Sequence, residues 1–169
     1  MANTFELISS VTVGSGGAAS IDFTSIPSTY TDLCIKLSGR GTESALKSNA
    51  LFSFNGSTTG FTVRYLGADG STPYTNSGSF RFCAFVNAAT STANTFSNND
   101  IYIPNYAGSA NKSWSTDGVT ENNATQTEMW MIAGLWSNTA AITSIGLTLS
   151  SGNFVQYSTA YLYGVNKNA

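Results

Sequence analysis

The sequence contains no histidine, and only 9% of its 169 residues are charged. Histidine is the usual general base near neutral pH and the commonest metal ligand in proteins. Its absence removes the simplest routes to acid–base, nucleophilic and metal chemistry. We therefore expect a protein that is not an enzyme and that has neither a cofactor nor a metal site.

Charge of either sign is scarce and is not clustered. Seven basic residues against nine acidic residues give a formal net charge of -2, and the basic residues are spread along the chain. Nucleic-acid binding needs a clustered basic face that neutralises phosphates. No apolar run approaches the roughly 20 residues that cross a bilayer, and the first residues do not resemble a secretion signal. We expect synthesis in a cytoplasm, with no nucleic-acid or membrane partner.

The sequence has only two cysteines, Cys34 and Cys83. Two are too few for a disulfide framework, and their spacing does not match a metal-binding or redox motif. We predict that both are buried, reduced thiols. A single bridge between them is the alternative.

Apolar residues are plentiful despite the shortage of charge. They make up 41% of the chain and aromatic residues 12%, which is enough to offset the entropy lost on ordering. A chain of this length fits one compact domain. We therefore predict one domain over residues 1–169.

The apolar residues follow a period of two, and no helical periodicity is evident. The alternating segments are rich in β-branched and aromatic residues and are separated by clusters of Gly, Asn, Ser and Pro. This pattern predicts an all-β protein, a two-sheet antiparallel sandwich resembling a jelly roll. The predicted strands are residues 5–13, 19–23, 32–39, 50–54, 61–66, 80–86, 100–103, 113–119, 127–136, 142–149 and 159–165.

Residues 128–136 depart from the usual pattern, because apolar side chains would project from both faces of one strand. Either a loop of the same chain covers the second face, or that face is a subunit interface. Large apolar patches are uncommon on soluble monomers, and Trp, Met and Tyr are enriched at interfaces. The last strand raises the same question. The predicted interface residues are Met129, Trp130, Met131, Trp136, Tyr161 and Tyr163.

The acidic and the aromatic residues each raise the question of carbohydrate chemistry. The nine acidic residues offer nominal carboxylate pairs for a glycosidase, but their spacing carries no signature, and each is interpreted as a solvated strand or turn residue. Aromatic residues such as Tyr65, Tyr74, Tyr106 and Trp114 could stack on sugar rings, as in a carbohydrate-binding module. Burial in the core or in an interface is the alternative for most of them.

Three segments carry a resemblance that goes beyond a generic β pattern: residues 17–33, the run Ile103-Pro104-Asn105-Tyr106-Ala107-Gly108, and the ending Ala160-Tyr161-Leu162-Tyr163-Gly164-Val165. Together they resemble small virion structural proteins of tailed bacteriophages, especially phages of cyanobacteria and other aquatic bacteria. A similar opening, an Ile-Pro-Asn-Tyr segment and a Leu-Tyr-Gly ending recur in that family. The motifs are structural and contain no catalytic group.

Within these motifs, Phe23 and Ile26 are interpreted as core residues around a turn. Pro27 fixes φ and ends a strand, and Tyr30 is expected to cap the corner before the alternation resumes at Leu33. The residues taken as the structural motif are Phe23, Ile26, Pro27, Tyr30, Leu33, Pro104 and Tyr106.

The resemblance implies a component of the virus particle. A short module suits a capsid decoration or cement protein, made in the host cytoplasm and bound to the capsid surface as a homotrimer. Its partner would then be the major capsid protein of the same phage. The alternative is a tail-fibre or receptor-binding module that binds a host glycan.

Overall fold

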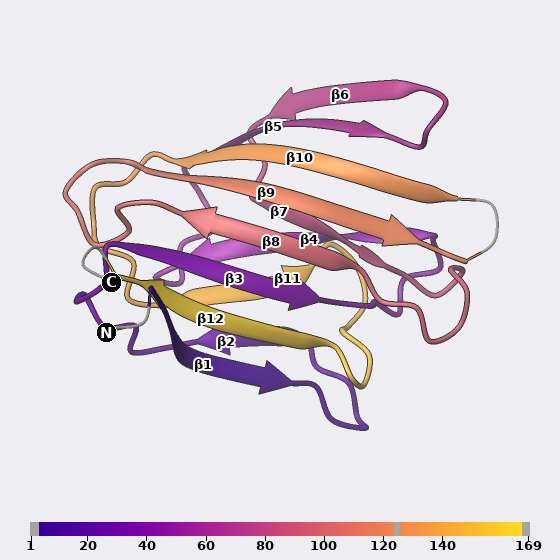
Figure 1. Ribbon diagram of the computed structural model, residues 1–169, viewed down its shortest axis with the longest axis horizontal. Helices are drawn as coiled ribbons and strands as arrows, with labels where there is room; N and C mark the ends of the chain where they lie inside the picture. The colour runs from indigo at the N-terminus through magenta and orange to yellow at the C-terminus, as the bar shows by residue number, and fades with distance from the viewer. Residues whose placement is uncertain (1–3, 124–125, 167–169) are drawn as a thin grey trace.

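The structure, a computed structural model, describes residues 4–123 and 126–166. The ends of the predicted domain, residues 1–3 and 167–169, lie outside the described residues. In the described part the chain forms twelve β-strands and no helix (Figure 1). The strands are β1 (Phe5–Thr12), β2 (Ser20–Phe23), β3 (Asp32–Ser38), β4 (Lys47–Phe54), β5 (Phe61–Ala68), β6 (Pro73–Gly78), β7 (Phe82–Asn87), β8 (Asn98–Ile103), β9 (Lys112–Glu121), β10 (Thr127–Trp136), β11 (Ile145–Leu149) and β12 (Thr159–Val165).

The strands form two antiparallel sheets of unequal size. The larger sheet has the order β1-β12-β3-β8-β9-β10-β5-β6, and the smaller sheet has the order β2-β11-β4-β7. The smaller sheet has the strand order of one sheet of a jelly roll. Without the inserted β9–β10 pair, strands β3, β8, β5 and β6 of the larger sheet have the order of the other jelly-roll sheet. The β9–β10 pair is inserted between β8 and β5, and β12 and β1 extend the sheet beyond β3. The prediction of a jelly-roll-like β-sandwich is confirmed.

Eleven of the twelve strands coincide with predicted segments, and β6 was missed. The sequence of β6 begins with proline and continues with small polar residues, which are typical of turns rather than strands. It is an exposed edge strand held by its pairing with β5, where Leu66 lies opposite Thr75. Pairing with a neighbour, and not its own apolar pattern, makes this segment a strand.

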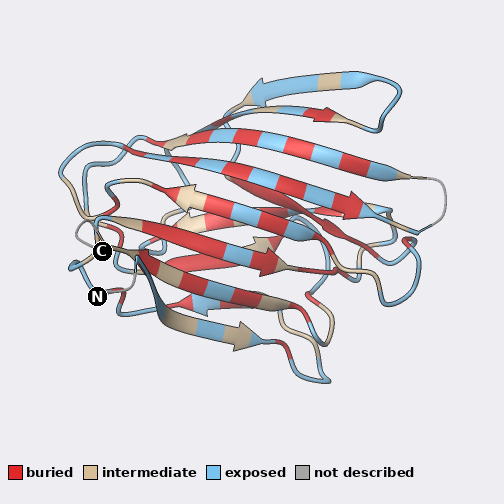
Figure 2. Cartoon of the chain, viewed as in Figure 1, coloured by how far each residue is buried: buried red, intermediate tan, exposed pale blue. Residues whose placement is uncertain are grey.

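The core lies between the sheets, and the strands of the larger sheet show buried and exposed residues in alternation (Figure 2). Its aromatic centre joins the two layers. Phe54 of the smaller sheet contacts Trp114 and Trp136 of the larger sheet, with ring centroids 6.0 and 5.4 Å apart in edge-to-face geometry. Such pairs contribute about 0.5–1.5 kcal/mol each beyond their buried area.

The edge strand β7 of the smaller sheet is closed to further strands. All six of its residues are buried. The side chain of Thr116 donates a 2.7 Å hydrogen bond to the carbonyl of Cys83, and Asn99 donates a 2.9 Å bond to the carbonyl of Phe85. Side chains of the larger sheet therefore satisfy backbone groups that an exposed edge strand would offer to another chain.

Both cysteines are buried and free, as predicted. Cys34 lies on β3 of the larger sheet, where its thiol donates a hydrogen bond of 3.2 Å to Asp100. Cys83 lies on β7 of the smaller sheet. Burial, followed by the hydrogen bond and the charge of Asp100, raises the pKa of Cys34 to about 12, and burial also raises the pKa of Cys83.

We predict that Gly134→Ala destabilises the protein. Gly134 on β10 faces the core, and an added Cβ would overlap the ring of Trp114. Overpacking of this kind lowers the free energy of unfolding by about 1–3 kcal/mol. Gly14→Ala is the matched control because no heavy atom lies within 4 Å of its added Cβ. Urea unfolding measures both variants, and equal midpoints would contradict this packing.

The raised thiol pKa values predict slow alkylation of the native protein. We expect iodoacetamide at pH 8 to label neither cysteine until urea unfolds the chain. Because the folded pKa of Cys34 lies above its unfolded value of 9.0, the unfolded state loses this proton first. Stability from this group should therefore be complete below pH 9 and decline as the pH rises towards 12. Mass spectrometry of labelled protein gives the test, and rapid native labelling would refute the buried placement.

Candidate functional site

The outer face of the larger sheet carries an exposed apolar surface. Met129 and Met131 of β10 are 62% and 65% exposed, and Leu66 of β5 and Val119 of β9 are also exposed. Leu66 lies directly opposite Met131, and Val119 lies opposite Met129. Side chains paired in this way on one face of a sheet are neighbours. We call the surface formed by Leu66, Val119, Met129 and Met131 the methionine face.

The methionine face contains a shallow depression and has a charged border. The depression, about 140 Å³ in volume, lies between β10 and the β5–β6 hairpin and includes Ala68 and Pro73 in its lining. The exposed residues Asp117 and Arg64 lie beside the face on β9 and β5. An apolar centre with a polar rim is the usual anatomy of a protein–protein interface.

The structure divides the interface residues predicted on β10. Met129 and Met131 point outward, whereas Trp130 and Trp136 point into the core and are only 2% exposed. The assignment of these two tryptophans to an interface is therefore corrected, because both are enclosed by their own chain. Within the described residues, no loop covers the outward side of β10 at the methionines, so the interpretation of a covering loop is also wrong.

Tyr161 and Tyr163 of β12 lie on a separate part of the sheet. Tyr161 is 38% exposed, and the half-buried Tyr163 makes an edge-to-face contact with the exposed Phe5, at a centroid distance of 6.5 Å. Leu7 lies opposite Tyr163 on β1 and is exposed as well. We call Phe5, Leu7, Tyr161 and Tyr163 the tyrosine face. Four strand steps separate β12 from β10, which is about 19 Å at the usual strand spacing.

The motif residues meet in one structural junction. Phe23, Ile26, Leu33 and Tyr106 are buried in the core. The hydroxyl of Tyr106 donates a hydrogen bond to the carbonyl of Pro27, so the Ile-Pro-Asn-Tyr segment is tied to the turn after β2. The junction therefore connects segments that lie far apart in the sequence.

Asp32 and Tyr30 complete this junction. One carboxylate oxygen of Asp32 accepts a 2.7 Å hydrogen bond from the backbone of Asn105, which has a φ of 49° in the turn that follows Pro104. The ring of Tyr30 packs on Gly164, where an added Cβ would overlap it. These contacts fix the chain's corners, so the motif residues Tyr30 and Asn105 have a structural role.

A groove lies on the inner side of the larger sheet, where the sheet extends past the smaller one. β7 packs against β9 and β10, so β5 and β6 continue beyond it (Figure 1). The inner sides of β5 and β6 contribute Tyr65, Tyr74 and Asn76 to a cavity of about 370 Å³. A second depression of about 450 Å³ continues from it and shares Leu51 and Phe80. We call the two together the aromatic groove.

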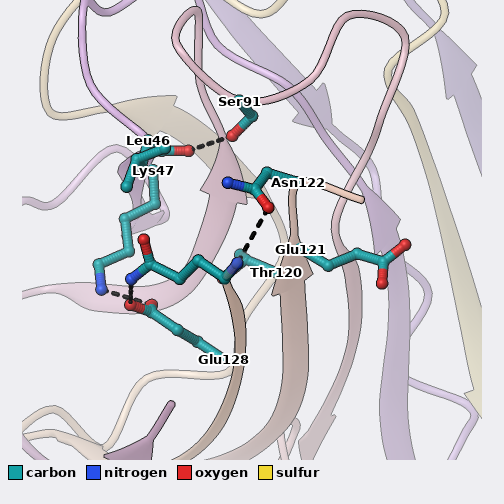
Figure 3. A pocket seen from close by; sticks show the side chains of 8 residues that line it. Leu46, Lys47, Ser91, Thr120, Glu121, Asn122 and Glu128 are labelled. Atoms are coloured by element: carbon teal, nitrogen blue, oxygen red, sulfur yellow. Dashed lines mark hydrogen bonds and ion pairs between the residues drawn. The ribbon is translucent and has the colours of Figure 1, made fainter. Parts of the chain in front are cut away.

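An ion pair closes one end of the aromatic groove. Lys47 Nζ lies 2.5 Å from Glu128 Oε2 and 4.3 Å from the centre of the Trp130 ring. Gln126 donates a 2.5 Å hydrogen bond to the other oxygen of Glu128. Figure 3 shows the pair beside a pocket of about 10 Å³, enough for a single water molecule. Burial and then the charge of Glu128 raise the pKa of Tyr74, which therefore stays protonated.

Two further cations are buried, and neither has a carboxylate partner among the residues that the structure describes. Arg40 donates hydrogen bonds to the carbonyls of Thr92 and Ser91 at 2.8 and 2.9 Å, and Lys112 donates to the carbonyl of Gly108 at 2.7 Å. Burial lowers the pKa of both side chains. Because their donors are directed at loop carbonyls, these cations stabilise connections between strands.

Neither a metal cluster nor a membrane helix is found in the described residues. Within residues 4–123 and 126–166, no group of three or more Cys, Asp or Glu side chains is placed to hold a metal ion. The same part of the chain has no helix long and apolar enough to span a bilayer.

Sequence reasoning found part of the two candidate surfaces. The two methionines were expected at an interface, and Tyr65 and Tyr74 were among the aromatics considered for sugar stacking. Leu66, Val119, Lys47 and the groove itself were missed. The groove depends on β6 and on the unequal widths of the two sheets, neither of which has a local signal in the sequence.

Comparison of the chain with protein-family models and with curated proteins finds no match in either case.

Proposed function

We propose that this chain is a structural protein of a tailed-bacteriophage virion: a capsid decoration protein that binds the assembled shell as a homotrimer. The observation that carries the proposal is the methionine face. Met129 and Met131 are 62% and 65% exposed, and Leu66 beside them is exposed as well. An apolar surface of this kind is suited to burial against another protein. The resemblance of the three motif segments supplies the particle context.

The two apolar faces suit the two contacts that a decoration protein makes. The methionine face is assigned to contacts between copies of the chain, because methionine side chains adapt to a partner's shape and are enriched at interfaces. The tyrosine face lies about 19 Å away on the same sheet and is assigned to the shell. Each surface can then be occupied without blocking the other.

The rest of the molecule suits a clamp between shell subunits. Neutral hydrogen bonds hold its corners and its β7 edge, as at Tyr106 and Thr116. Such bonds depend less on ionic strength than exposed ion pairs do. A rigid protein that binds only the assembled shell stabilises the shell by mass action.

The proposal predicts a high copy number in the particle. Quantitative mass spectrometry of purified virions should give on the order of one copy of this chain per copy of the major capsid protein, because the decorated surface is a repeating lattice. A ratio far below one would contradict the decoration role and favour the tail. Absence from particles would overturn the virion assignment altogether.

A double substitution, Met129→Asp with Met131→Asp, should break the trimer. Two carboxylates would be buried without partners in the interface, whereas in the separate chain both positions are open to solvent. Light scattering after gel filtration should therefore show the mass of one chain, with the melting temperature of the isolated chain retained. Ser15→Asp, at an exposed turn, should leave the trimer intact. A wild-type monomer, or a trimer that survives the double substitution, would contradict this interface.

A further inference from the structure

The aromatic groove has the shape and the lining of a ligand site. Its two connected depressions, about 370 and 450 Å³, fall within the volume range of small-molecule sites. Such sites combine aromatic walls with a few polar groups. The elongated form, continuous at Leu51 and Phe80, suits a chain-like ligand better than a compact one.

The aromatic walls of the groove are held in place by close packing. Trp130 lies with its ring centroid 3.8 Å from that of Phe85 and 4.9 Å from that of Tyr74. A Cβ at Gly67 would lie 2.5 Å from the Trp130 ring and 2.7 Å from the Tyr74 ring, so glycine is needed for this arrangement. The walls are therefore formed before any ligand arrives.

Phe80 presents an aromatic surface where the two depressions meet. Its side chain is 45% exposed, yet its ring packs on Gly78, where an added Cβ would overlap it. An exposed aromatic ring held in this way can stack on an apolar face of a sugar without losing much further conformational freedom. The half-buried ring of Tyr65 lies along the same groove.

Two amide side chains supply polar contacts beside these rings. Asn49 and Asn76 are exposed at the groove. The amide of Asn49 makes no hydrogen bond to the described residues, and Asn76 uses only its oxygen, which accepts from the backbone of Ser77 at 2.7 Å. Amides both donate and accept, which matches the hydroxyl groups of a sugar.

Both cations at the groove bond to groups of the protein itself, but only the charge of Lys47 is neutralised, because the partners of Arg81 are uncharged. Lys47 is paired with Glu128, and Arg81 donates to the carbonyl of Phe52 and the hydroxyl of Thr148 at 3.0 and 3.4 Å. No acidic residue is among the described residues that line the two depressions. The lining therefore offers no counter-ion to a cationic ligand, and apart from Lys47 and Arg81 it consists of uncharged side chains, which suit a neutral ligand.

A peptide strand is a poorer fit to this place. Strand addition needs an edge with free backbone groups. Two edge strands border the groove. At β7, Thr116 and Asn99 already donate to the carbonyls of Cys83 and Phe85. The other edge, β6, is a short strand of mostly small polar residues that begins with proline, which offers a peptide few apolar contacts.

We infer that the aromatic groove binds a neutral oligosaccharide, with a sugar ring stacked on Phe80 and its hydroxyl groups bonded to Asn49 and Asn76. Glycan binding would be a second activity besides shell decoration. It would let a protein on a particle surface also attach to a glycan. The groove and the methionine face lie on opposite sides of the larger sheet.

The test is a titration of the isolated wild-type protein with neutral hexasaccharides built from glucose, mannose, xylose or N-acetylglucosamine. Calorimetry should show saturable binding of at least one of them, and NMR should show shifts of the Asn49 and Asn76 side-chain amide signals. Loss of a stacked ring in Phe80→Ala should weaken binding about tenfold. Asn49→Ala should weaken it as well, because its amide bonds only the ligand.

Tyr157→Ala is the matched control, because Tyr157 is an aromatic residue that is 67% exposed and lies outside the groove, in the segment between β11 and β12. It should bind like the wild type, and all three variants should keep the wild-type circular dichroism spectrum. The inference is overturned if no neutral hexasaccharide binds, if Phe80→Ala binds as tightly as the wild type, or if only an acidic probe such as oligogalacturonate binds. The titration uses no particles, so its result is independent of the copy number that decides the proposed function.

Discussion

Burial of aromatic rings between two sheets of unequal width is the constraint on which this structure depends. Phe54 and its neighbours on the smaller sheet hold Trp114 and Trp136 of the larger sheet in one packed layer. Because four strands cannot cover eight, the larger sheet keeps an uncovered inner margin at β5 and β6. The outer side of the larger sheet is open to solvent at Leu66, Val119, Met129 and Met131. The aromatic groove follows from that mismatch, and the methionine face lies on the outer side of the larger sheet, away from the smaller sheet.

Because charged residues are few, the buried polar groups of this protein are hydrogen-bonded mainly to neutral groups. Neutral groups serve here as hydrogen-bond partners where many proteins use ion pairs. Arg40 and Lys112 donate to loop carbonyls. Asn99 and Thr116 donate to carbonyls of the edge strand β7. Buried polar groups need partners of some kind, but these need not be charged. The one ion pair with a buried member among the described residues, Lys47 with Glu128, lies at the end of the aromatic groove.

The orientation of β10 shows how far local sequence goes. Alternation requires Trp130 and Met131 to face opposite sides, but it does not say which side is the core. Long-range pairing decides this. Trp130 lies opposite Gly118 of β9 and Gly67 of β5, and Gly134 leaves room for Trp114. Gly67 and Gly118 belong to other strands, so the inward placement of the tryptophans could not be read from residues 127–136 alone.

The sequence by itself determined the all-β class and eleven of the strands, because alternation and turn chemistry are properties of neighbouring residues. It favoured reduced thiols but left a Cys34–Cys83 bridge open, and the structure shows both cysteines free. Only the tertiary structure decided that β6 is a strand, that the methionine and tyrosine faces are separate, and that an aromatic groove exists. Each of these depends on which strands pair and on how far one sheet extends past the other. The pairing of β6 with β5 joins residues 5 to 15 positions apart, and the separate faces and the groove depend on strands much farther apart in the chain. No pattern within a single strand records these contacts.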